Sequence, residues 1–461
     1  MRMRKNSFAC YKYFLITTVL LLMVAGSVHG AWRTEWQVGV DVEYSDNISR
    51  SDGDEDDAVF LQPRGAITAV HEGPNFDVEI GAANEYRSRL SGDQGSSNNF
   101  DLDGVANWKI VPGLFEWSFE DHFNSEFPID IRATPNESNN QDINSFSTGP
   151  SFTPRIFNRT NLIFEARYFR TDAEESDIDN NRIQARAAIE RQLSPNSSLS
   201  LNYLYEDTDF DENNIDPLIA NIDFDRDNYF LQYNLARKSL SIEAQLGYTD
   251  IERDEGPNQS SSGGNNFLNL NYVLNSTSSI NLTAYDEFTD TTSDANRNGG
   301  SELGGGFGGV GGGGSSGIIS DTPIGDIVFD VSGDTVDSEG FFVSFDKRFS
   351  SLETSFQYFQ RDDDHDLVNI NDRDSNGGIV TFNLPIGATT AIGLIAEYRT
   401  TDFDLGDRED DDLLVELTGE RFVRQNLSLD SSIEYRDRNS TILGEDFDEF
   451  QVRLGITYRN F

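Results

Sequence analysis

The stretch Trp36-Gln-Val-Gly-Val-Asp-Val-Glu-Tyr44 alternates apolar and polar residues and ends on a tyrosine. In a β-strand successive side chains point to opposite faces, so the apolar residues of this stretch share one face and Gln37, Asp41 and Glu43 share the other. The same alternation, closed by an aromatic residue of the apolar parity, returns in later segments. The closing aromatics are Tyr44, Tyr86, Phe123, Tyr168, Tyr205, Tyr248, Phe288, Tyr358, Tyr398 and Tyr435.

An amphipathic aromatic at the end of each apolar stripe is typical of strands that cross a membrane and stop at its interface with water. Alternation and turn residues together predict about 20 strands, in a range of roughly 18–22. Short connections such as 111–113 alternate with long ones such as 361–376, as in barrels with short periplasmic turns and long extracellular loops. We therefore predict an all-β fold, a transmembrane antiparallel β-barrel with long acidic loops, whose closing tyrosines form an outer girdle.

The first 30 residues have the pattern of a secretory signal peptide. Basic residues precede an apolar run from Phe14 to Ala25, and small residues stand before Ala31, where a signal peptidase would cleave. The apolar run is shorter than the about 20 residues that a membrane-spanning helix needs. Cys10 would leave with this segment, so disulfides and thiolate metal sites are excluded. We predict a signal peptide over 1–30, a barrel over 31–461, and location in the bacterial outer membrane.

Charge restricts the possible partners. The chain has 80 acidic and 35 basic residues and a formal net charge of −45. Phosphate recognition needs clustered cations, so no nucleic acid is expected as a partner. A mean hydropathy of −0.51 with this charge would suit a disordered chain. However, 11% of the residues are aromatic and they recur at alternate positions, and a barrel wall has only one apolar face, so a membrane barrel is compatible with both numbers.

The longest expected loop covers about 289–338 and has a glycine-rich core from Gly304 to Gly317. This composition predicts a flexible segment. Two interpretations stay open, a surface loop outside the barrel and a loop that folds into the lumen and constricts it. Apolar residues in 318–336 would also allow an extra hairpin.

One acidic stretch matches the first half of a calcium-binding loop. Asp372, Asp374 and Asn376 have the spacing D-x-D-x-N, and Gly377 follows them. The glutamate that closes such loops is missing, because the twelfth position is Asn383. Looser bridging by Ca²⁺ or Mg²⁺ between acidic loops and anionic lipopolysaccharide is the alternative, since like charges would otherwise repel. No other cofactor is expected.

Catalysis is not expected. Beyond the signal segment the histidines are His71, His122 and His365, and none belongs to a nucleophile motif. We interpret them as surface residues, expect no enzyme, and assign no catalytic residues.

The residues on the polar face of each strand are predicted to line the lumen. Residues such as Glu35, Asp77, Glu243 and Arg453 would face inward, where water or ion pairs must surround them. A barrel of about 20 strands is too wide to be closed by its own interior side chains, so an aqueous channel is expected unless a loop blocks it. An acidic lumen favours cations and neutral sugars and disfavours an acidic polymer.

These features resemble a known family. The signal peptide, the segment Val40-Asp-Val-Glu-Tyr-Ser-Asp-Asn47, the repeated strand-tyrosine-acid units and the strand that ends at Phe461 are similar to β-barrel porins associated with exopolysaccharide-synthesis and exosortase systems. The resemblance covers nearly all of the chain after the signal segment. It implies an outer-membrane conduit or accessory for surface polysaccharide, with polysaccharide-export components as partners, and it supplies no catalytic residues.

The carboxyl end resembles the signal by which the barrel-assembly machinery recognises its substrates. One departure is that Val452, Leu454, Ile456 and Tyr458 have the opposite parity to Phe461. The other expected partners are this assembly machinery, outer-membrane lipid and lipopolysaccharide.

The leading hypothesis is a porin-like channel that serves exopolysaccharide export or solute diffusion. The alternative is a structural or adhesive surface barrel whose acidic loops bind divalent cations.

Overall fold

The computed structural model describes most of the chain. The described residues are 32–53, 56–91, 96–128, 140–174, 178–211, 214–216, 219–254, 259–290, 334–367, 372–404, 406 and 408–460. The expected signal peptide, nearly all of the expected loop at 289–338, and Phe461 lie outside them. Within the part of the chain that is described, no helix is long and apolar enough to cross a membrane.

The described secondary structure consists of strands. In chain order they are β1 (Trp32–Ser45), β2 (Ala58–Glu72), β3 (Phe76–Arg89), β4 (Ser97–Val111), β5 (Phe115–Pro128), β6 (Asn140–Phe152), β7 (Arg155–Phe157), β8 (Thr160–Ala173), β9 (Asn180–Ser194), β10 (Ser197–Phe210), β11 (Asn214–Asp216), β12 (Ile219–Asn221), β13 (Phe224–Arg237), β14 (Leu240–Arg253), β15 (Ser260–Asn275), β16 (Ser278–Asp290), β17 (Thr335–Phe349), β18 (Leu352–His365), β19 (Arg373–Ile386), β20 (Thr390–Phe403), β21 (Arg408–Arg424), β22 (Leu427–Ser440) and β23 (Phe447–Asn460).

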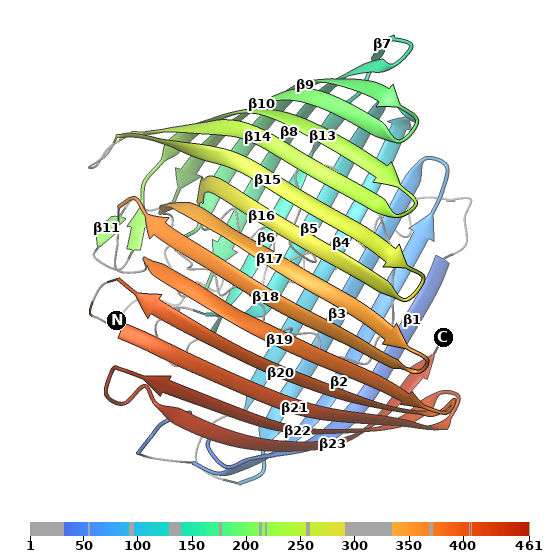
Figure 1. Cartoon of the computed structure of the whole chain (residues 1–461), viewed down its shortest axis with the longest axis vertical. Coiled ribbons are helices and arrows are strands. Elements are labelled where there is room, and N and C mark those ends of the chain that lie inside the picture. The colour runs from blue at the N-terminus through green and yellow to red at the C-terminus, as the bar shows by residue number, and fades with distance from the viewer. Residues whose placement is uncertain are drawn as a thin grey trace.

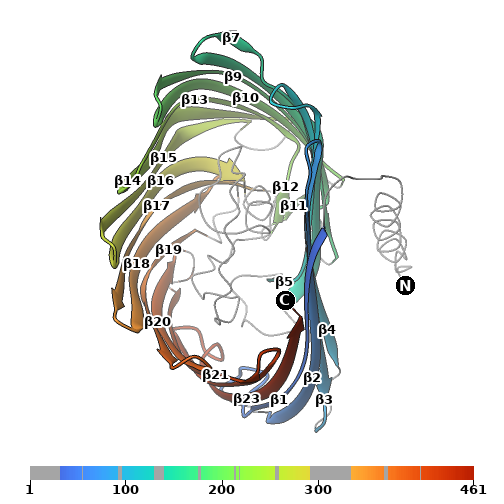
Figure 2. The ribbon, with the colours of Figure 1, turned by 90° about the vertical axis from the view of Figure 1, so that its right-hand side faces the viewer.

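Twenty of these strands form one closed antiparallel barrel (Figures 1 and 2). Each pairs with the strand before it and the strand after it, and β1 closes the wall by pairing with β23 from Trp36↔Asn460 to Ser45↔Gln451. Closure leaves no unpaired edge, which a strand surrounded by lipid could not tolerate. The predicted fold class and the expected strand number are confirmed.

The remaining short strands lie in connections. β7 adds to β8 within the β6–β8 turn, and β11 pairs with β12 between β10 and β13. Neither was predicted, because strands of three residues are too short to show alternation.

Short turns gather at one end of the barrel and long connections at the other. The turns after β4 and β19 place Gly113 and Gly387 at φ of +71° and +72°, a left-handed conformation that glycine adopts without steric cost. Since outer-membrane barrels turn tightly on the periplasmic side, we call the end with short turns periplasmic and the opposite end outer. The first and last barrel strands then both have their free ends at the periplasmic side.

The outer surface of the wall is apolar between two levels of aromatic residues. On this face Leu201, Leu246 and Leu454 are 61%, 67% and 62% exposed. Trp36 and Tyr458 mark its periplasmic border, where their rings lie 5.6 Å apart. A soluble monomer rarely exposes a continuous apolar surface of this kind, whereas a lipid-facing band requires one. The chain is a transmembrane barrel of the bacterial outer membrane.

Candidate pore and surface sites

The eight tyrosines expected in the outer girdle all lie on the outward face. Tyr435 is 38% exposed, and Tyr248 and Tyr398 are each 50% exposed. Several hydroxyl groups of this level donate hydrogen bonds to acids directly above, for example Tyr398 to Asp411 at 2.7 Å and Tyr203 to Asp227 at 2.6 Å. This placement, with the ring toward lipid and the hydroxyl toward polar groups, suits a membrane interface. The girdle role itself stays a prediction.

The two phenylalanines of the same series are placed differently from expectation. Phe123 and Phe288 are each 7% exposed. Phe123 packs against Phe100, with 5.6 Å between ring centroids, and Phe288 joins an apolar cluster with Phe210, Phe224 and Ile251. For Phe288 the reason is that parity counting assumes a strand that stays in the wall to its end, whereas β16 stops pairing with β15 at Glu287.

Ion pairs cover much of the inward face. Arg64 reaches Asp41 at 2.9 Å between β2 and β1, and Arg186 reaches Glu165 at 3.1 Å between β9 and β8. Arginine suits such pairs because its planar fork binds two acceptors at once. A single acid can also serve two arginines, since Asp363 accepts from Arg361 at 2.6 Å and from Arg373 at 3.1 Å. The sequence pattern predicted these residue types for the lumen, with water or ion pairs around them, but not which residues pair with which.

Burial of the inward side chains changes along the barrel axis. On β9, Arg182 and Gln184 near the outer end are buried, whereas Glu190 and Gln192 near the periplasmic end are half-buried and exposed. β1 shows the same change from exposed Glu35 to Asp41, which is 1% exposed. On these strands the inward side chains are therefore packed more closely toward the outer end and are more accessible to water toward the periplasm.

A cavity near the periplasmic rim agrees with this gradient. It has a volume of about 400 Å³, and its lining runs from β15 to β21. Side chains of Ser279, Asp346, Asn383 and Thr418 contribute hydroxyl, carboxylate and amide groups to it. Such groups can replace the hydration of a polar solute.

The calcium-loop stretch has a different geometry from the one that its motif assumes. Asp374 and Asn376 lie within β19, where they pair with Asp362 and Gln360 of β18 and with Asp402 and Thr400 of β20. An extended strand cannot curl its side chains around one ion as a calcium loop does. The expected loop conformation is thus corrected, because pairing on both sides holds this stretch straight.

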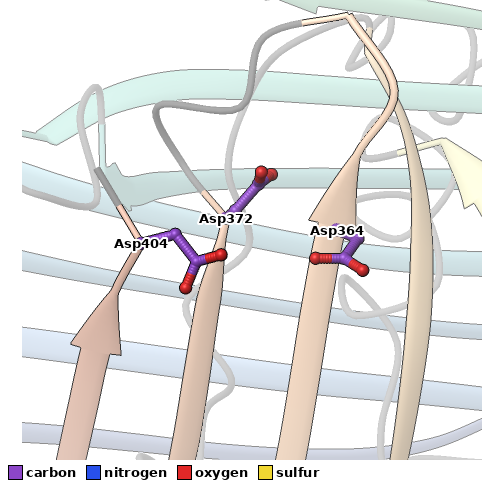
Figure 3. A group of neighbouring side chains, drawn as sticks. All are labelled: Asp364, Asp372 and Asp404. Carbon is purple, nitrogen blue, oxygen red and sulfur yellow. The ribbon is translucent and has the colours of Figure 1, made fainter.

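Asp372 instead lies in another acidic group, with Asp364 at the outer end of β18 and Asp404 directly after β20 (Figure 3). One carboxylate oxygen from each of the three lies within 4.8 Å of the others. Sequence spacing could not find this group, because its members lie at the ends of three different strands, β18, β19 and β20. Calcium binding at Asp372, Asp374 and Asn376 stays a prediction.

The histidines lie on three separate strands. His71 is buried on β2 beside Trp32, with ring centroids 5.0 Å apart. His122 on β5 lies 3.4 Å from Asp103, and His365 on β18 lies 3.2 Å from Asp372. The interpretation of all three as solvated surface residues is wrong for His71 and His365, which are 0% and 9% exposed.

Comparison with known proteins gives no family. No family model matches the sequence, and no curated protein matches it. The resemblance to exopolysaccharide-associated barrels therefore has no support from a family match.

Similar solved structures are outer-membrane barrels of low identity. The siderophore receptor PirA from Pseudomonas aeruginosa is 10% identical, with 93% of this chain and 80% of that chain covered and a TM-score of 0.42. The FrpB iron transporter from Neisseria meningitidis is 9% identical, with 92% and 81% covered and a TM-score of 0.46. OccAB4 from Acinetobacter baumannii is 10% identical, with 94% and 100% covered and a TM-score of 0.39. These values are too low to indicate a shared function, and the chain's own strand pairing establishes its fold.

Proposed function

We propose that the barrel is an outer-membrane channel for cations and small neutral solutes. The observation that carries this proposal is the polar lumen, which is accessible to water in its periplasmic half and enclosed by a wall of 20 strands. A barrel of this size encloses an aqueous space unless it is filled.

Carboxylates set the sign of the selectivity. In the periplasmic half of the lumen Glu35 and Glu79 are exposed, and Glu190 and Glu243 are half-buried. Lumenal arginines such as Arg64 and Arg167 are already paired with acids, at 2.9 Å to Asp41 and 2.8 Å to Glu120. Accessible negative charge attracts cations and leaves neutral solutes unaffected.

Purified protein in planar bilayers should show a stable open state selective for K⁺ over Cl⁻. Replacing Glu35, Glu79 and Glu243 together with glutamine should lower the cation-to-anion permeability ratio by roughly half or more, since three lumenal charges are removed. The matched control is Glu409→Gln, which removes an acid at the outer end of β21 on the outward parity. Absence of any conductance in the wild-type protein would overturn the channel, and an unchanged ratio in the triple variant would overturn the role of these carboxylates.

We also propose that the channel serves export of a surface polysaccharide. The resemblance of the strand-tyrosine-acid units supports this, and the acidic lumen favours a neutral polymer over an acidic one. A deletion strain should retain neutral polysaccharide in the periplasm, and plasmid-borne wild-type protein should restore its release. Normal release of the polysaccharide from the deletion strain would contradict the export proposal without affecting the proposed channel function.

A second candidate function is attachment at the cell surface through divalent cations. The closeness of Asp364, Asp372 and Asp404, with oxygens within 4.8 Å of one another, favours it. Calcium titration by calorimetry should give weaker binding for Asp404→Asn than for Asp437→Asn, which removes an acid near the outer end of β22. Cells that carry the protein should lose surface attachment when calcium is chelated, and equal calcium binding by both variants would contradict this function.

A further inference from the structure

The outer end of β16 leaves the barrel wall. Pairing between β15 and β16 stops at Asn265↔Glu287. Beyond that point β15 continues to pair with β14, as far as Ser260, and β16 continues to pair with β17, as far as Asp290↔Thr335. The seam between β15 and β16 is therefore open at its outer end, and Figure 2 shows the end of β16 turned toward the barrel interior.

A glycine allows this turn. A Cβ atom at Gly263 of β15 would lie 2.6 Å from the Cβ of Phe288, closer than two such atoms can approach. The chain of β16 thus crosses close over Gly263. Phe288 then packs with Phe210 of β10, Phe224 of β13 and Ile251 of β14. These three residues have the opposite parity to the outward Tyr205, Tyr229 and Tyr248 of the same strands, so Phe288 lies on the lumenal side of the wall.

A ring of four buried charges holds the same strand end. Arg182 of β9 contacts Glu206 of β10 at 3.2 Å and Asp290 of β16 at 2.8 Å. Arg226 of β13 contacts the same two acids at 2.6 Å and 3.1 Å. The four side chains are between 0% and 4% exposed. The ring is electrically neutral and each charge in it has two opposite partners.

Strand spacing shows how far Asp290 lies from the position that it would have in a regular barrel wall. Neighbouring strands lie about 4.8 Å apart, so a β16 that stayed in the wall would be separated from β13 by about 14 Å and from β9 by about 24 Å along it. Contacts of 3.1 Å to Arg226 and 2.8 Å to Arg182 require the strand end to lie over the inner faces of β14 and β15. The start of β17 is turned inward together with it, since Thr335 pairs with Asp290 and the Thr335 hydroxyl accepts a hydrogen bond from Arg253 of β14.

We propose that this inward strand end, Phe288–Asp290 with Thr335 and Val336, is the outer constriction of the channel and selects solutes by size. The inference rests on the proposed channel function. Because the charge ring is neutral, the constriction adds a steric barrier without a preference for either sign of charge. Charge selection is then left to the accessible carboxylates of the periplasmic half.

Cysteine cross-linking tests the position of β16 without any need for conductance. The only native cysteine, Cys10, belongs to the expected signal segment, so each engineered pair would be alone in the processed protein. If β16 stayed paired with β15 in the register that ends at Asn265↔Glu287, Phe288 would lie opposite Gly264. The inward turn instead places Phe288 against Gly263. Gly263→Cys with Phe288→Cys should form a disulfide in the outer membrane of intact cells, and Gly264→Cys with Phe288→Cys should form much less. The reverse order would overturn the inward turn.

Conductance tests the constriction itself. Asp290→Asn removes one acid from the ring and should weaken the hold on the strand end, so single-channel conductance and the largest permeant neutral sugar should both increase, with conductance rising about twofold or more. Asp411→Asn, on the outward face of β21, is the control and should leave both unchanged. If the wild-type protein conducts and Asp290→Asn changes neither the conductance nor the largest permeant sugar, the proposed constriction is wrong but the proposed channel function is retained. If the wild-type protein does not conduct, the channel fails, while the cross-linking result still decides the position of β16.

Discussion

Replacing Arg182 with methionine is expected to lower the free energy of unfolding by about 3–5 kcal/mol. The guanidinium of Arg182 lies between Glu206 and Asp290, both of which are 0% exposed. Methionine keeps an unbranched apolar stem but lacks the charged guanidinium, so two buried carboxylates are left with Arg226 as their common ion-pair partner in the ring. Burying charge without full compensation is costly in a site from which water is excluded. Urea unfolding in lipid vesicles, followed by tryptophan fluorescence, would measure the loss.

The matched control for this variant is Arg33→Met. Arg33 pairs with Glu72 at 3.5 Å, but the two side chains are 71% and 78% exposed. Water already solvates such a pair, so its loss should change the free energy of unfolding by less than about 1 kcal/mol. Equal effects of the two substitutions would show that water reaches the Arg182 ring and that the ring does not hold β16.

Replacing Leu454 with arginine is expected to cost about 2–4 kcal/mol of folding free energy in a bilayer. Leu454 is 62% exposed on the outward face of β23. It lies midway along the strand between Phe450, which pairs with the outward Tyr435, and Tyr458 at the periplasmic border. A cation at this depth must be removed from water or must deform the lipid around it. The same vesicle unfolding assay measures the effect.

Leu454→Ala separates the charge effect from loss of contact. Alanine removes apolar area but brings no charge to the lipid, so its effect should be clearly smaller than that of arginine. In detergent micelles, which let water reach the side chain more easily, the difference between the two variants should shrink. If arginine is tolerated as well as alanine in a bilayer, the outward face of β23 does not contact lipid.

Much of the architecture was predictable from local pattern. A strand such as Trp32–Ser45 shows its two faces in the sequence, because alternation is a property of one segment and needs no knowledge of its neighbours. Turn glycines such as Gly113 and Gly387 are local in the same way. The antiparallel barrel, its approximate strand number and the outward placement of the closing tyrosines follow from these signals.

The candidate sites were less predictable because their members are distant in the chain. Asp364, Asp372 and Asp404 meet only because β18, β19 and β20 are neighbours in the wall. The spacing of Asp372, Asp374 and Asn376 suggested a loop, but pairing with two neighbouring strands made the stretch extended. Phe288 has the parity of a lipid-facing residue and nevertheless lies in the lumen, because β16 separates from β15 before its end.

By itself the sequence determined that the chain forms strands with one apolar and one polar face, and hence that it closes around water within lipid, because side-chain alternation and the avoidance of free strand edges in lipid leave few other folds. Only the tertiary structure decided which charges pair on the lumenal face of the wall and where the strand end of β16 lies. Those outcomes depend on contacts such as Arg182 with Asp290, which are 108 residues apart. Burial makes such contacts strong, and no periodicity in the sequence encodes them.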